Sequence, residues 1–343
     1  MKQMTRSLKT AFDRRSFLGK GLITGGAGAI GSAWIANAAF PLQAKAAPTT
    51  PPSAYNYTVY RDHPVGGTYY CQRYDGTVIA SDPNYADSVI QAALNQYFLE
   101  DPSSGYGPGS IAVRTANYVL SPGFSGFQVH SWTTLKLDPT ARIIVPSGYA
   151  GAVFQLLNTD TEEVQNTTID GGVVFEQNPQ HQWTGFLLKG SAQSVKSGIL
   201  FNKISTTTIS DAKVGVKIWV TTPNSFINSN TFEFLRMWGC QAFVDFQIDP
   251  PYQPGQQNFG IIGNHFFDLQ CQSTAATKAG ISNITGWHNS FVETKIWDLG
   301  SGFRANIVPQ ADSTVIVGGI LAGGANVFQD KGVNTRVFDS LYP

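Results

Sequence analysis

The chain has 343 residues, which is enough for one large domain or two of ordinary size. Charged residues make up 13% and hydrophobic residues 42%, and Gly (35) and Pro (18) are frequent, so the composition excludes a disordered chain and disfavours a helical bundle. The 23 basic and 23 acidic residues balance, which excludes a dominant basic field. We therefore predict a β-rich globular protein with no nucleic-acid partner.

Residues 1–46 have the layout of an export signal. A basic segment precedes a Gly/Ala-rich apolar stretch from Gly21 to about Phe40, and residues 44–46 supply a small-x-small cleavage site. The signal closely resembles the twin-arginine type in the run Asp13-Arg14-Arg15-Ser16-Phe17-Leu18-Gly19-Lys20. Because the apolar stretch is only weakly hydrophobic, we favour a cleaved signal over an N-terminal anchor. We expect a periplasmic or extracellular protein, exported by the twin-arginine route, with no stable membrane anchor after cleavage.

Removal of this signal changes the charge of the chain. Residues 1–46 hold seven basic residues and one acidic residue, so 16 of the 23 basic and 22 of the 23 acidic residues remain, a net charge of −6. Such a protein has no general attraction for polyanions, and an anionic ligand needs a local basic patch.

Residues 47–83 are predicted to form a Pro/Thr-rich linker and a group of short strands. Runs rich in Tyr, Thr and Val predict strands at Tyr57–Tyr60, Thr68–Arg73 and Thr77–Ala80. The dipeptide Asp75-Gly76 predicts a hairpin between the last two.

One helix is predicted in the mature chain. Asp82 or Asn84 caps it, and it runs to about Leu99. Its apolar residues recur at spacings of three and four, at Val89, Ile90, Ala93, Leu94 and Tyr97.

Two repeating series follow the helix. In the first, Asn is followed two residues later by an aromatic residue, at Asn230-Thr-Phe232, Asn264-His-Phe266 and Asn289-Ser-Phe291. In the second, a Gly opens an alternating run, at Gly185, Gly215, Gly280 and Gly302, and the run from Ala242 fits the same position without its Gly. Interleaved series with one variable period predict a solenoid of stacked coils, in which Asn side chains form a ladder and Phe232, Phe266 and Phe291 stack. A β-sandwich predicts no such series in phase.

The opening runs of this region resemble the first coils of the pectate-lyase-like superfamily: Ser110-Ile-Ala-Val, Tyr118-Val-Leu, Ser131-Trp-Thr-Thr-Leu-Lys-Leu and Asn166-Thr-Thr-Ile-Asp-Gly-Gly. The helix at 84–99 resembles the cap at the N-terminal end of that fold. The resemblance spans about residues 84–320. It implies an all-β fold, a right-handed single-stranded parallel β-helix with an N-terminal capping helix, over residues 84–343.

Alignment of the Asn series predicts a first candidate site. Four residues after each Asn come Phe234, Asp268 and Glu293, and six residues after come Arg236, Gln270 and Lys295. Stacked carboxylates repel, which suits general acid or base catalysis, and a pair of carboxylates can also hydrolyse a glycosidic bond. The candidate catalytic residues are Asp268, Glu293, Lys295, Arg236 and His265. The alternative is that Asp268 and Glu293 only bind the bend or pair with Lys295.

The Gly series predicts a second face. Lys217 and Arg304 share one outward column, with Val244 and Ser282 between them, while Lys189, Trp219 and Asn306 share the next. Lys or Arg can neutralise a uronate carboxylate, which makes Lys217 and Arg304 candidate substrate-binding residues. Solvated surface charge is the alternative.

Trp183 and Trp287 lie in polar segments and are the candidate platforms for sugar rings.

The remaining residue types give little sign of a cofactor. Three Cys residues (71, 240 and 271) make no disulfide framework and are predicted to be small buried hydrophobes. The five His residues form no HxH or HExxH pair, so we predict no zinc site. The pectate lyases that the chain resembles bind calcium through clustered Asp. The Asp residues here are dispersed, so we expect no cofactor; calcium stays open as an alternative that the sequence does not support.

Export, resemblance and in-phase charges together predict a carbohydrate-active protein with a polysaccharide partner. The first hypothesis is a polysaccharide lyase that cleaves a uronate-containing glycan by β-elimination. A glycoside hydrolase or fructotransferase on the same fold is the nearest alternative. A non-catalytic surface or glycan-binding β-helix protein is another, and the sequence leaves its oligomeric state open.

Overall fold

The computed structural model describes residues 55–64, 66–100, 109–249, 260–297, 303–321 and 328–338. The described residues belong to the compact unit Thr49–Pro343, and the export-signal prediction for residues 1–46 lies outside them. Within the described ranges, no helix is long and apolar enough to cross a membrane.

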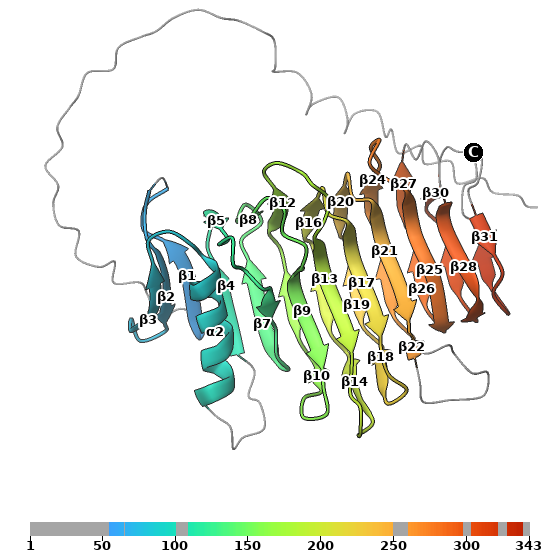
Figure 1. Cartoon of the computed structure of the whole chain (residues 1–343), viewed down its shortest axis with the longest axis horizontal. Helices are drawn as coiled ribbons and strands as arrows, with labels where there is room; N and C mark the ends of the chain where they lie inside the picture. Colours follow the sequence, from blue (N-terminus) through green and yellow to red (C-terminus); the bar gives the residue numbers. More distant parts are fainter. Residues whose placement is uncertain are drawn as a thin grey trace, which may run out of the picture. The chain divides into compact units, whose positions relative to one another are not determined.

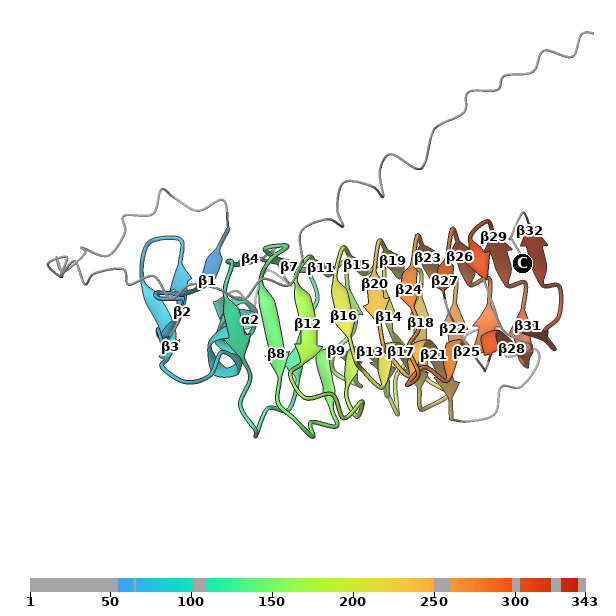
Figure 2. The same ribbon diagram turned by 90° about the horizontal axis from the view of Figure 1, so that it is seen from above.

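The unit is built from three sheets that the chain visits in turn (Figures 1 and 2). From β4 onward every strand pairs in parallel with the strand one coil away, which defines a parallel β-helix and confirms the predicted fold class. Sheet A contains, in order of neighbours, β3 (Val78–Asp82), β2 (Tyr69–Arg73), β1 (Tyr57–Arg61), β4 (Gly109–Val113), β7 (Thr133–Leu137), β11 (Thr168–Asp170), β15 (Lys203–Ser205), β19 (Thr231–Glu233), β23 (His265–Phe267), β26 (Ser290–Val292), β29 (Val315–Val317) and β32 (Arg336–Phe338).

Sheet B follows sheet A after a short bend in each coil. Its strands are β5 (Asn117–Val119), β8 (Arg142–Val145), β12 (Val173–Glu176), β16 (Thr208–Ser210), β20 (Arg236–Trp238), β24 (Gln270–Gln272), β27 (Lys295–Trp297) and β30 (Ile320–Leu321).

Sheet C closes each coil and leads back to sheet A. Its main strands are β6 (Phe127–Gln128), β9 (Ala152–Asn158), β13 (Thr184–Gly190), β17 (Val214–Val220), β21 (Ala242–Ile248), β25 (Ala279–Trp287), β28 (Phe303–Asp312) and β31 (Phe328–Asp330). A second row of short strands contains β10 (Val164–Gln165), β14 (Ser197–Leu200), β18 (Ser225–Asn228) and β22 (Gly260–Ile262), and it joins β25 where Ile262 meets Trp287.

The strands alternate between an inward apolar residue and an outward residue, as their sequences predict. Phe232, Phe266 and Phe291 are buried and in register, with ring centroids 4.6 and 4.7 Å apart and planes within 9°. The predicted phenylalanine stack is therefore confirmed.

The predicted asparagine ladder is also present, and it begins one coil earlier than the sequence series. Asn202 donates to Asn230, Asn230 to Asn264, and Asn264 to Asn289 through side-chain amides at 2.9, 2.9 and 3.1 Å. All four side chains are buried. The motif search missed Asn202 because Ile204, not an aromatic residue, follows it in the stack.

The bends between sheets A and B have a recurrent backbone conformation. Thr206, Phe234, Asp268 and Glu293 occupy equivalent positions with φ between 45° and 55°. This left-handed region disfavours residues with a Cβ, and Gly318 occupies the same position one coil further on.

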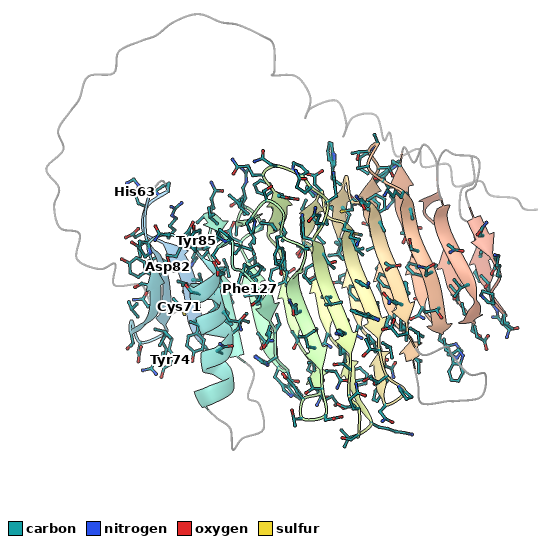
Figure 3. The ribbon with its side chains drawn as sticks, in the orientation of Figure 1. His63, Cys71, Tyr74, Asp82, Tyr85 and Phe127 are labelled. Carbon is teal, nitrogen blue, oxygen red and sulfur yellow. The ribbon has the colours of Figure 1, made fainter. Side chains whose placement is uncertain are left out.

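The N-terminal end is closed by a hairpin and by helix α2 (Asp87–Glu100) (Figure 1). Strands β2 and β3 pair antiparallel across Asp75-Gly76, as predicted. The helix begins later than predicted, because the Asp82 carboxylate accepts hydrogen bonds from the N–H groups of Asn84 and Tyr85 in a turn that precedes it. Figure 3 labels Asp82 and Tyr85 there, together with the buried Cys71 on β2.

The predicted apolar face of α2 is buried at Val89, Ile90, Ala93 and Leu94. The helix lies against strands β1, β2, β3, β4 and β6, so it covers apolar side chains at the first coils.

All three cysteines are buried thiols, which confirms that they act as small core residues. Burial raises the pKa of Cys71 and Cys240 to about 12, so both are neutral near pH 7.

Candidate functional site

A hollow of about 400 Å³ lies over the bend between sheets A and B. It crosses several successive coils, so it follows the stacking direction for roughly 19 Å at about 4.8 Å a coil. The residues that line it are Pro139, Gly172, Thr206, Thr208, Phe234, Arg236, Asp268 and Gln270.

The register of the Asn series brings most of the first candidate cluster together. Arg236, Gln270 and Lys295 pair in one column of sheet B, as predicted. Asp268 and Glu293 occupy adjacent bends, where the Asp268 N–H donates to the Val292 carbonyl. The alignment is therefore confirmed in its geometry, while the catalytic role of these residues stays a prediction.

The Asp268 carboxylate already has two partners. Lys295 Nζ binds Asp268 Oδ1 at 2.5 Å, and Gln270 donates to Oδ2 at 3.4 Å. Glu293 is exposed and its carboxylate lies against Gly318 of the next coil, so it is not among the residues that line the hollow. Each carboxylate thus lies against a residue of the following coil, Asp268 against Lys295 and Glu293 against Gly318, and of the two only Asp268 lines the hollow.

His265 lies on sheet A rather than in the hollow. Its Nδ1 is 2.7 Å from Ser290 Oγ of the next strand, with which His265 is in register. The structure therefore separates His265 from Arg236 and Asp268.

Arg236 is the exposed cation of the hollow. Its guanidinium has no hydrogen bond or ion pair with the described residues. Two exposed aromatic side chains flank it on the same strand and bend: Phe234 is 52% exposed and Trp238 is 59% exposed. An unpaired guanidinium between two exposed aromatic rings suits an anionic ligand that also has apolar faces.

The second predicted face is shifted by one residue. Lys217 pairs with Asp245, not with Val244, which is buried in the core. The run from Ala242 aligns with Val214 rather than Gly215, so the predicted register was wrong by one residue and the faces exchange.

Arg304 does not share the column of Lys217. It lies between Phe303 and Ala305, which pair with Ala279 and Ile281, so it is level with Gly280 and two residues away from Ser282. Its side chain lies outside the described residues. The predicted Lys217 and Arg304 pair is therefore not formed.

Lys189 and Trp219 do share a column, as predicted. The ammonium groups of Lys189 and Lys217 lie 4.6 and 4.8 Å from the Trp219 ring centroid. Both lysines thus cover the Trp219 ring. Asn306, predicted for the same column, instead donates a hydrogen bond from its side-chain amide to Asn283, whose own amide donates to Asp245.

The predicted tryptophan platforms have different outcomes. Trp183 is completely buried, so the expectation that it presents a ring to a sugar was wrong. Trp287 is half-buried at the end of β25, in register with Ile262 and Asp312. Among the described tryptophans, the exposed one is Trp238, whose outward direction follows from the alternation Arg236-Met237-Trp238 around the buried Met237.

A second acidic group lies beside Trp238 on sheet B. Glu176 is buried, and its two carboxylate oxygens accept hydrogen bonds from the N–H groups of Gly148 and Gln180. Burial and the charge of Glu176 raise the pKa of Asp211, and the nearby His181 opposes them.

Within the described ranges, no group of three or more His, Cys, Asp or Glu side chains has a metal-binding arrangement.

Because the pKa of Asp211 is raised, we predict that replacing Asp211 stabilises the folded protein, and that the size of this effect depends on pH. A raised folded-state pKa means that stability is full at low pH and is lost as pH rises through that pKa. Asp211→Asn is therefore expected to raise the thermal midpoint at pH 7–8, with a gain that shrinks as the pH falls through the raised pKa of Asp211.

Asp160→Asn is the opposite control for this pH series. Hydrogen bonds from the N–H groups of Ser194 and Gln193 lower the pKa of Asp160, so its replacement should destabilise the protein at neutral pH. Thermal melts of both variants between pH 4 and 8 check the prediction. An Asp211→Asn midpoint at or below wild type at pH 8 contradicts it.

The parallel pairing and the groove-bearing bend define a β-helix protein. No protein-family model matches the sequence, and no curated protein matches it. Among solved structures, the chain is similar to the surface adhesin PfbA of Streptococcus pneumoniae, with a TM-score of 0.40 and 10% identity over 75% of this chain and 78% of that one.

Two viral proteins are similar as well. The ORF18 protein of Geobacillus virus E2 has a TM-score of 0.31 and 12% identity over 73% of this chain and 56% of its own. Tailspike protein 3 of bacteriophage CBA120 has a TM-score of 0.26 and 9% identity, over 73% and 55%. This chain therefore spans little more than half of each viral protein, and the fold assignment rests on its own strand pairing.

Proposed function

We propose that this is an exported β-helix protein that binds an acidic polysaccharide along the hollow between sheets A and B. The observation that supports this is the Arg236 guanidinium, which pairs with none of the described side chains and lies between the exposed rings of Phe234 and Trp238. Arg binds a uronate carboxylate through two parallel N–H bonds, and aromatic rings pack on the apolar faces of sugars.

The elongated hollow suits a chain ligand. Its lining residues come from bends stacked about 4.8 Å apart, so successive coils offer repeated polar contacts at Thr206, Thr208 and Gln270. Membership of the pectate-lyase-like superfamily and the twin-arginine export route are part of the same proposal.

Two substitutions test the binding site without disturbing the coil. Arg236→Gln should weaken binding to an acidic polysaccharide at least tenfold, since a charge-assisted contact is lost. Phe234→Gly should weaken it as well while keeping or raising the thermal midpoint, because glycine suits the φ of 55° at this bend. Binding is measured on a panel of immobilised acidic and neutral polysaccharides, at low and high salt.

Arg142→Gln is the matched control. Arg142 lies in the same outward column of sheet B, three coils toward the N-terminus and outside the hollow. Its loss should leave binding unchanged. Equal effects of the two arginine variants, or wild-type protein that retains no acidic polysaccharide, would contradict the proposal.

A polysaccharide lyase at the same hollow is the second candidate. The observation that favours it is that Arg236 and Asp268 both line the hollow, and that the Asp268 carboxylate forms an ion pair with Lys295. In β-elimination, Arg236 neutralises the uronate carboxylate, and a base removes the C5 proton. The C4–O bond then breaks, the leaving oxygen takes up a proton, and a C4–C5 double bond remains. Asp268 takes the proton or orients Lys295.

Ultraviolet absorbance of the unsaturated product separates lyase from binding protein. If the lyase candidate holds, Asp268→Asn should lose about a hundredfold in rate while still binding the polymer. Bound polymers that yield no unsaturated product with the wild-type protein remove this candidate. Release of reducing ends without that product indicates a glycoside hydrolase instead.

A further inference from the structure

Sheet B carries a second polar and aromatic group next to the hollow, centred on Trp238 and Asp211. Arg236 and Trp238 are two residues apart on β20 and both point outward, so they lie about 7 Å apart along the strand. Ser210 pairs with Trp238, and the next residue, Asp211, donates its N–H to the Trp238 carbonyl at 2.8 Å.

The Asp211 carboxylate has space because of a glycine. A Cβ on Gly239 would stand 2.5 Å from Asp211 Oδ1, so that oxygen occupies the place that a side chain after Trp238 would fill. Asp211 and Gly239 both have positive φ at equivalent bends. Within the described residues, no side-chain hydrogen bond or ion pair takes the Asp211 carboxylate.

The charged groups around this carboxylate are of both signs. Burial is the main cause that raises the pKa of Asp211, while the nearby His181 lowers it and the buried Glu176 of the preceding coil raises it. A carboxylate beside an exposed indole accepts hydrogen bonds from sugar hydroxyls, but its negative charge repels a second uronate.

We propose that Trp238 and Asp211 form a subsite for a neutral sugar, next to the acidic sugar held by Arg236. The sugar ring packs on the Trp238 indole and donates hydroxyl hydrogen bonds to Asp211. The ligand is then a heteropolysaccharide in which a neutral sugar is attached to a uronate. This inference rests on the proposed acidic-polysaccharide binding.

The test compares two polymers, gellan, which contains uronate and neutral sugars, and polygalacturonate, which contains only uronate. Trp238→Ala should weaken binding to gellan about tenfold and binding to polygalacturonate by a clearly smaller factor. Asp211→Gly, which suits the positive φ, should weaken gellan binding and leave polygalacturonate binding unchanged or stronger. Titration with gellan should change tryptophan fluorescence in the wild type and not in Trp238→Phe.

Trp297→Ala is the matched control. Trp297 lies in the outward column of Trp238, two coils further on, and should not affect either polymer. If Arg236→Gln weakens both polymers while Trp238→Ala weakens neither or both equally, the subsite is overturned and the proposed function stands. Wild-type binding to polygalacturonate at least as tight as to gellan also overturns the subsite. If Arg236→Gln weakens neither polymer, or the wild type binds neither, the proposed function itself fails.

Discussion

Replacing Phe266 with Ala is expected to lower the free energy of unfolding by about 3–5 kcal/mol. The Phe266 ring is completely buried between Phe232 and Phe291, with centroids 4.6 and 4.7 Å away, and Phe246 packs on it at 5.9 Å. Backbone strands fix both neighbours in register, so the coil collapses little around the missing ring and a cavity remains.

Phe267→Ala is the control for this prediction, since it removes the same ring from the next residue. Phe267 points outward and is 37% exposed, so its loss should cost much less. Urea unfolding of both variants gives the comparison. Equal midpoints for the two variants would mean that the phenylalanine stack does not hold the coils together.

Replacing Asn264 with Leu should be as damaging, although it adds apolar volume. Asn264 Oδ1 accepts hydrogen bonds from the N–H and the side-chain amide of Asn230, and its own amide donates to Ile227 and Asn289. Leu leaves the two Asn230 donors and the Ile227 carbonyl without this partner inside the core. At about 1–3 kcal/mol for each of these three unsatisfied groups, we expect a loss of about 3–9 kcal/mol.

Asn264→Asp adds a pH signature to this test. A buried carboxylate is costly when charged, so burial raises its pKa and stability is lost as pH rises through that value. The variant should therefore be less stable at pH 7 than at pH 4, relative to wild type. Asn306→Ala, which removes one exposed hydrogen bond, is the control and should change little. A similar loss for Asn306→Ala and Asn264→Leu would contradict the ladder argument.

The coil architecture was predictable because core residues repeat. Asn264 and Phe266 recur in neighbouring coils at fixed separation, and stacking at a constant strand distance leaves one alignment. The same reasoning missed Asn202, because the core accepts Ile204 as readily as a phenylalanine there.

The outer face was less predictable, because one residue of slip exchanges inside and outside. In sheet C, the strand from Ala242 has Phe243 where the neighbouring strand has Gly215. Because the alignment relied on that glycine, it placed Val244 in the column of Lys217, where the structure has Asp245. Trp183 shows the same limit: its polar neighbours in the sequence predicted an exposed ring, but the ring is buried inside the coil. Trp238 was within reach, because Met237 between two outward residues fixes its direction.

The hairpin at the first coil has a consequence for self-association. A stack of parallel strands ends in a row of unpaired backbone groups, which is a template for adding a foreign strand. Here β1 is followed outward by β2 and then by the exposed β3, and the pairing of β2 with β3 is interrupted by a register shift between Cys71 and Gln72. The irregular antiparallel edge offers no flat parallel template. At this end, we therefore expect the irregular edge to oppose the end-to-end polymerisation to which stacked β-structures are prone.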